Sequence, residues 1–185
     1  MTGQPTSRKS TKSSKRRTTA GHTVSYTISE ERTLSPVREQ VIRQAEKFPD
    51  RRDLFLCHAW DDRKDAAKEL HDLLEAQGAT VWFSEKDVVL GTSLIRKIDE
   101  GLRNSRIGIV LVTPAMFKSL DSAGVADKEL SALLATDRVI PVTHQTNFEE
   151  LRDVSPLLAA RSGLSTEGSS LEEVAIKIAE TIIDI

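Results

Sequence analysis

The feature that most limits the fold of this chain is an alternation of short apolar runs with amphipathic stretches, which begins at residue 53. The clearest apolar run is IGIVLV, residues 107–112. A continuous run of this kind is typical of a strand that is covered on both faces, as in a parallel sheet. Further strands are expected at 53–57, 80–84, 138–144 and, at the sheet edge, 159–165. The alternation predicts an α/β fold with a parallel sheet wrapped by helices.

The stretches between these runs carry the spacing of helices. Helical periodicity is expected at 62–78, 93–102, 124–138 and 169–184, and residues 113–124 are expected to form a loop. In the last helix, Ser169 and Glu172 have the spacing of a capping box. A separate short helix is expected at 35–48, with Ser35 as its cap and Pro36 in its first turn.

The N-terminal region has a different composition from the rest of the chain. Residues 1–29 contain no acidic residue and six basic ones. Removing these six from the 26 basic residues leaves 20, against 28 acidic residues. We therefore expect a disordered, basic, Ser/Thr-rich tail at 1–34, a helix or linker at 35–50 and one domain at 51–185. The tail could contact an anionic membrane, nucleic acid or an acidic protein surface, or act as a transit peptide, but a solubilising tail or linker is the simpler interpretation, and nucleic acid is not the expected partner.

Composition excludes several classes of protein. No segment approaches the roughly 18 apolar residues of a membrane span, and no secretory signal follows the N-terminal charges. The single cysteine, Cys57, excludes an internal disulfide, and the four histidines lack zinc-site spacing. We therefore expect a cytoplasmic protein without a bound metal.

The function of a parallel sheet is sought at the carboxyl ends of its strands. Here these ends are followed by loops after Cys57, Ser84, Thr113 and His144. The first of these loops has no glycine, which argues against a phosphate-binding loop. The third strand ends in Thr113 rather than in the aspartate of a phosphoacceptor receiver, and no Gly-x-Ser-x-Gly of a serine hydrolase is present. Cys57 and His58 are neighbours in a strand and so point to opposite faces, which argues against a catalytic pair.

Glu129 has an unusual place on the predicted helix 124–138. The buried face of that helix is centred on Ala126, Leu130, Leu133 and Leu134. Glu129 lies roughly 80° from this centre, on the flank that also carries Val125, whereas Lys128 lies nearly opposite the core. On the residues alone, such a boundary carboxylate is typical of an ordinary salt bridge.

Three blocks of the sequence resemble bacterial TIR (Toll/interleukin-1 receptor-like) domains. They are DLFLCHAWDD, GATVWFSEKDVVLGTSLIRKIDEGLRNSRIGIVLVTP and DKELSALL followed by RVIPVTH. The resemblance extends from about Asp53 to Ile185. It implies a flavodoxin-like TIR fold, which is a five-stranded parallel sheet of order 2-1-3-4-5 with helices on both faces.

The resemblance also implies an activity. Some TIR domains cleave NAD+ at the nicotinamide–ribose bond, giving nicotinamide and ADP-ribose or a cyclic isomer, and others are non-catalytic scaffolds that signal by TIR–TIR association. In the enzymes a glutamate on the helix after the third strand is catalytic, and it aligns with Glu129. The family tryptophan four residues earlier is replaced by Val125, which is the feature that favours the scaffold. We expect the enzyme, with NAD+ as its substrate, no other cofactor, self-association through residues 85–93 and a role in prokaryotic immune or stress signalling.

The remaining candidate substrate-binding residues each keep a structural alternative. His58 and Ala59 occupy the family's Ser-His-Ala positions, and His58 either donates to a ribose or phosphate oxygen or is a hydrogen-bonded structural histidine. Trp60 either stacks on a ring of NAD+ or is a surface aromatic.

Two further candidates flank the second loop, and one ends the strand before it. Phe83 alternates with Trp82 on a strand, so that one of the two is expected to face the core and the other the cleft. Asp87 and Ser93 are expected to bind substrate, although capping of the next helix also explains Ser93.

Overall fold

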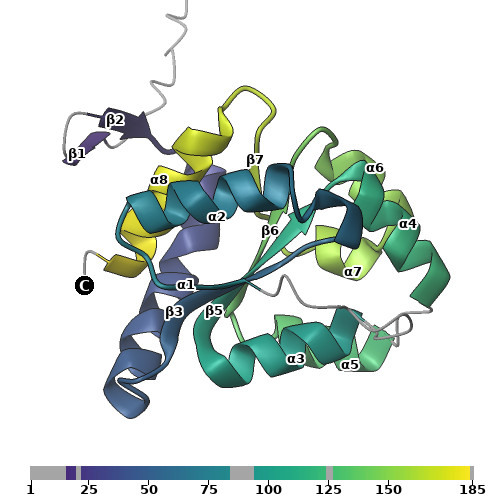
Figure 1. Cartoon of the computed structure of the whole chain (residues 1–185), viewed down its shortest axis with the longest axis horizontal. Helices are drawn as coiled ribbons and strands as arrows, with labels where there is room; N and C mark the ends of the chain where they lie inside the picture. Colours follow the sequence, from purple (N-terminus) through teal and green to yellow (C-terminus); the bar gives the residue numbers. More distant parts are fainter. Residues whose placement is uncertain (1–15, 20–21, 84–93, 124–126, 184–185) are drawn as a thin grey trace, which may run out of the picture.

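The computed structural model describes residues 16–19, 22–83, 94–123 and 127–183 (Figure 1). Its centre is a five-stranded parallel sheet of order β4-β3-β5-β6-β7. The strands are β3 (Arg52–Cys57), β4 (Val81–Phe83), β5 (Ser105–Val112), β6 (Val139–Thr143) and β7 (Leu164–Ser165). In chain order this is 2-1-3-4-5, so the predicted fold class and strand order are confirmed.

Helices cover both faces of this sheet. On one face lie α1 (Ile28–Lys47), α2 (Ala66–Ala76) and α8 (Leu171–Ile183). On the other lie α3 (Leu94–Asn104), α4 (Pro114–Ala123), α5 (Asp127–Leu134), α6 (Phe148–Val154) and α7 (Pro156–Ala159). Two hydrophobic clusters result, one on each face, and the buried strand residues alternate between them. The run at 107–112 is buried throughout, as its continuous apolar pattern predicts.

A large aromatic ring locks α3 against the sheet. Phe55 is 1% exposed. A Cβ atom added at Gly101 would lie 2.4 Å from the Phe55 ring, and one at Gly108 would lie 2.2 Å from it. The two glycines therefore leave the space that this ring fills, so the family-like spacing around Gly101 has a packing explanation.

The first helix begins earlier than the sequence pattern predicts. Thr27, not Ser35, is the cap of α1, and a capping box joins it to Glu30. Pro36 lies inside the helix rather than in its first turn. The prediction of disorder up to residue 34 is therefore wrong for the described part of that range, which also contains a hairpin of β1 (Arg16–Thr19) and β2 (His22–Ser25).

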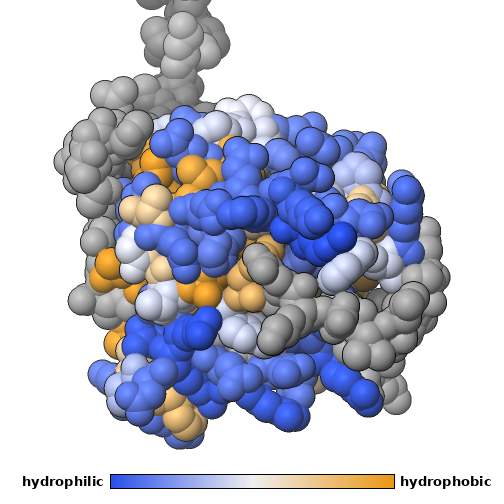
Figure 2. Space-filling model, in the orientation of Figure 1, coloured by the Kyte–Doolittle hydropathy of each residue, from blue (hydrophilic) through white to orange (hydrophobic). Residues whose placement is uncertain are grey.

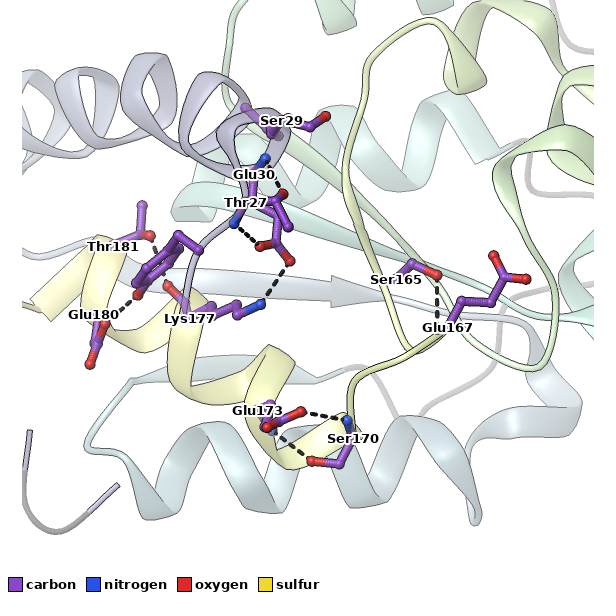
Figure 3. A network of polar contacts seen from close by, with 12 residues as sticks. Thr27, Ser29, Glu30, Ser165, Glu167, Ser170, Glu173, Lys177, Glu180 and Thr181 are labelled. Carbon is purple, nitrogen blue, oxygen red and sulfur yellow. Dashed lines mark hydrogen bonds and ion pairs between the residues drawn. The ribbon is translucent and has the colours of Figure 1, made fainter. Parts of the chain in front are cut away.

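Contacts between α1 and α8 explain why the helix is extended (Figure 3). Lys177 of α8 donates to Glu30 of α1 at 2.8 Å, and both side chains are largely buried. Tyr26, just before α1, donates to the buried carboxylate of Glu180. Buried charges are tolerated when they are paired and hydrogen-bonded, so this network fixes the start of α1 on α8.

Three smaller predictions differ from the structure. Residues 114–123 form α4, not a loop, because Thr113 caps its first turn by accepting from the Met116 N–H at 3.2 Å. The capping box of α8 joins Ser170 to Glu173, one residue later than predicted. The predicted helix 124–138 is shorter, with α5 ending at Leu134.

The outer surfaces of the helices are polar, as expected for amphipathic helices on a sheet. Figure 2 shows mainly hydrophilic residues over α2 and α3, and hydrophobic residues mostly beside α8. Within the described ranges, no helix combines the length and the apolar character that a membrane crossing requires.

Candidate functional site

The candidate site lies at the carboxyl edge of the sheet, where β3 and β5 are neighbours. The chain leaves β3 toward α2 on one face and leaves β5 toward α4 and α5 on the other. Such a divergence forms a crevice, the usual ligand position in open α/β sheets. The edge carries His58, Ala59 and Trp60 after β3, Thr113 after β5 and His144 after β6.

His58 is held rigidly at this edge. It is 5% exposed, and its Nδ1 lies 2.8 Å from the carbonyl oxygen of Ala59. Because a carbonyl oxygen only accepts, Nδ1 is the donor in this contact. The imidazole also stacks on Phe83 with a centroid distance of 4.8 Å and an interplanar angle of 25°. The predicted hydrogen-bonded histidine is therefore present, and its ring orientation is fixed.

Trp60 lies on the surface in a short 3-10 helix, η1 (Trp60–Asp62). Its side chain is 41% exposed. The Arg63 guanidinium lies 3.8 Å from the indole centroid and donates to the Trp60 carbonyl oxygen at 2.7 Å. A cation already covers one indole face, so stacking with a ligand is left to the other.

The aromatic pair that ends β4 divides between the two faces. Phe83 packs with the α1, α2 and α8 side, whereas Trp82 packs with the side that contains α3 and α5. Both side chains are half-buried. The structure therefore brings Phe83 to His58, and places Trp82 on the face of the sheet that also carries Glu129.

Glu129 is the third residue of α5, in its first turn. This helix returns the chain to β6, which runs parallel to the other strands, so its first turn lies toward the carboxyl edge of the sheet. It packs between α3 and α7. The Glu129 side chain lies outside the described part of the structure, as do Asp87, Ser93, Val125 and the predicted association segment 85–93.

A polar contact across the crevice was missed by the sequence pattern. Thr113, directly after β5, donates to the Asp62 carboxylate in η1. This hydrogen bond joins the segment that follows β3 to the segment that follows β5. The available signal was a polar residue in each of the segments that follow β3 and β5, but the pairing requires the order of the strands in the sheet.

A polar groove opens beside this contact. It is lined by Asp62, by the start of α2 and by the residues His144 and Gln145 after β6. His144 is oriented by Thr166, whose hydroxyl lies 3.0 Å from its Nδ1. Among the residues with described positions, no cluster of His, Cys, Asp or Glu is arranged to hold a metal ion.

Cys57 is an unreactive residue of the core. It is buried at the end of β3, and burial raises the pKa of its thiol to about 11. A nucleophilic cysteine requires the thiolate, which this environment disfavours. The prediction that Cys57 is a small buried strand residue is confirmed.

Comparison with known proteins identifies the domain. The pattern of the TIR domain family matches residues 54–173. The chain is 34% identical to the 2' cyclic ADP-D-ribose synthase AbTIR of Acinetobacter baumannii over 137 residues, which are 71% of this chain and 49% of that protein. It is 33% identical to the NAD(+) hydrolase PdTIR of Paracoccus denitrificans over 137 residues, 71% of this chain and 44% of that protein.

An archaeal relative is similar to the same degree. The NAD(+) hydrolase TcpA of a Theionarchaea archaeon is 35% identical over 120 residues, which are 62% of this chain and 35% of that protein. The chain thus spans half or less of the length of these relatives. The family pattern nevertheless covers well over half of the chain, from β3 into α8. The chain therefore belongs to the TIR domain family.

Proposed function

We propose that this protein cleaves the bond between nicotinamide and ribose in NAD+. The observation that carries the proposal is the similarity, at 33–34% identity, to relatives that are named as an NAD(+) hydrolase and a 2' cyclic ADP-D-ribose synthase. The crevice at the switch point of the sheet supports it, because this is where an α/β fold of this topology binds a nucleotide-like ligand.

The reaction needs little acid–base chemistry. The electron pair of the C–N bond passes to the nicotinamide nitrogen, so the cationic ring leaves as a neutral molecule and needs no proton. A positive charge develops on the ribose, and a fixed carboxylate stabilises that charge electrostatically. Attack by water then gives ADP-ribose and a proton, and attack by a hydroxyl group of the same molecule gives a cyclic isomer and a proton.

We assign the carboxylate to Glu129. The assignment rests on its family-like register and on the position of its backbone in the first turn of α5. One carboxylate is sufficient here, whereas ordinary glycoside hydrolysis uses two. His58 and Trp60, at the adjacent end of β3, are proposed to contact the substrate.

The proposal extends to the cellular setting. We propose that copies of the chain associate through segment 85–93, that this association activates cleavage, and that the protein acts in the cytoplasm in immune or stress signalling. Salt and dilution would both weaken an association that depends on the charged residues of that segment.

The test is NAD+ loss at high protein concentration, measured for wild type and for Glu129→Gln. The substitution keeps the size of the side chain and removes its charge, so we expect the rate to fall at least about 10²-fold. Lys128→Gln, at the neighbouring position that helical spacing turns away from the core, is the matched control and should keep wild-type activity. Full activity in Glu129→Gln would refute the assignment of the residue.

Wild type without activity at any concentration would instead support a non-catalytic TIR scaffold. Val125→Trp examines this alternative, because it restores the aromatic residue at the family position. A gain of activity in this variant would show that the missing ring, rather than the absence of a catalytic site, limits the enzyme.

A further inference from the structure

Three aromatic rings from three different elements meet at the carboxyl edge. His58 follows β3, Phe83 ends β4, and His71 lies in the middle of α2. The centroid of Phe83 is 4.8 Å from that of His58 and 5.0 Å from that of His71. Ring pairs at this separation interact favourably beyond the area that they bury. Phe83 is thus the middle member of a row that connects a helix to the proposed site.

His71 is itself held in place by its own helix. Its Nδ1 lies 3.0 Å from an Asp72 carboxylate oxygen, and its Nε2 lies 3.4 Å from a Glu75 carboxylate oxygen. The Asp72 carboxylate is fixed in turn by Lys68, at 2.7 Å. The imidazole of His71 is mostly buried, although its two carboxylate partners are about half exposed. Contacts on both ring nitrogens limit rotation of the ring, which makes it a firm support for Phe83.

Two described contacts hold the His58 imidazole from different directions. Its Nδ1 lies 2.8 Å from the carbonyl oxygen of the next residue, in the plane of the ring. Phe83 stacks on the face of the ring at an interplanar angle of 25° and restricts its tilt. A displacement of Phe83 therefore removes one support of the His58 imidazole.

We propose that His71 is a positioning residue for NAD+ cleavage, which holds Phe83 against His58 and so fixes the His58 imidazole at the carboxyl edge. This inference rests on the proposed function. The imidazole ring of His71 supports Phe83, because the contact between the two residues is a ring–ring contact. The hydrogen bonds of His71 do not touch Phe83. His71 does not touch the substrate, and its effect reaches the reaction only through Phe83 and His58.

A pair of substitutions separates the ring from its polar groups. His71→Gln keeps hydrogen-bonding capacity and removes the ring, whereas His71→Phe keeps a ring and removes the polar contacts. We expect His71→Gln to lower kcat/KM for NAD+ about 2- to 10-fold, which is the range of one aromatic contact. His71→Phe should stay within about twofold of wild type. Gln77→Ala, an exposed change at the end of the same helix, is the control for general effects on α2.

A second measurement follows His58 directly. The chain has four histidines, so labelled imidazoles give few NMR signals. The ring current of Phe83 shifts the carbon-bound protons of His58, and this shift should be lost in His71→Gln and kept in His71→Phe. Thermal unfolding of each variant shows whether the fold is intact.

The outcomes separate the two proposals. Wild type that leaves NAD+ intact overturns the proposed function. Active wild type with an equally active His71→Gln variant, or an unchanged His58 signal in that variant, overturns the role of His71 alone. Equal losses in His71→Gln and His71→Phe also overturn it, because they would show that the polar contacts matter and the ring does not.

Discussion

Polar side chains make different kinds of contact at the amino edge and at the carboxyl edge of the sheet. At the amino edge, charged groups are bound to fixed partners. Asp53 accepts from Arg106 at 3.0 Å and from the backbone and hydroxyl of Thr80 at 2.7 and 2.8 Å. Arg138 donates to the carbonyl oxygens of Leu102, Ser105 and Arg106. Burial, with a smaller contribution from the charge of Arg51, lowers the pKa of Arg138 to about 10.

The carboxyl edge holds rings and single polar groups instead. His58 contacts the Ala59 carbonyl oxygen and the Phe83 ring, and Trp60 lies on the surface beneath the Arg63 guanidinium. The contacts of the amino edge thus join neighbouring strands to one another and to the end of α3, whereas the carboxyl edge presents side chains to a crevice. We conclude that stability is concentrated at one edge and the proposed activity at the other.

The largest expected effect is the loss of stability when the hydrogen bonds of Asp53 at the amino edge are removed. Asp53→Ala removes three hydrogen bonds and leaves Arg106 without its carboxylate, which should lower the free energy of unfolding by about 2–3 kcal/mol. The control is Asp99→Ala, because Asp99 and Arg103 form a pair in which both side chains are far more exposed. That variant should differ from wild type by less than about 1 kcal/mol.

Chemical denaturation measures both variants. The activity of the folded fraction should be unchanged in each of them. A loss of activity per folded molecule in Asp53→Ala would show that the two edges are coupled, and would contradict the separation that we infer.

The second prediction concerns the pH dependence of stability caused by the buried Cys57 thiol, which lies at the carboxyl end of β3. The pKa of Cys57 is about 11 in the folded protein and 9.0 in its ordinary state. The folded state therefore binds a proton that the unfolded state has lost, so the stabilising contribution is complete below pH 9 and disappears as the pH rises through 11. The expected loss between these values is roughly 2–3 kcal/mol at most.

The measurement is the free energy of unfolding against pH for wild type and Cys57→Ala. Other groups titrate in this range, so the difference between the two curves carries the result. A constant difference would show that water reaches the end of β3 and that the carboxyl edge is more open than its buried thiol indicates.

The smallest effect concerns the exposed aromatic. Trp60→Ala should change stability by less than about 0.5 kcal/mol, since the side chain is a surface residue. If the free indole face stacks on a ring of NAD+, KM should rise about fivefold, which corresponds to about 1 kcal/mol of stacking. Trp60→Phe should retain most of the affinity. An unchanged KM in Trp60→Ala would identify Trp60 as a surface aromatic without a role in binding.

The fold class could be predicted because apolar runs and helical spacing are local signals, whereas the strand order was expected only from the resemblance to TIR domains. The buried run at 107–112 and the edge strand near residue 164 are examples. The start of α1 could not be placed from spacing alone, although its capping box is visible as Thr27 and Glu30 once the helix is known. A polar N-terminal stretch indicates disorder unless another element pairs with it, and here α8 supplies that pairing.

The sequence by itself determined the parallel sheet, because periodicity is a property of short segments. Its motifs also resemble those of TIR domains, and that resemblance implies the family and the candidate carboxylate Glu129. Only the tertiary structure decided which face each ring of β4 occupies, that Thr113 joins Asp62, and that His71 supports Phe83 beside His58. These contacts join residues that are 12 to 51 positions apart in the chain. They depend on strand order and on the docking of α2, so no local pattern encodes them.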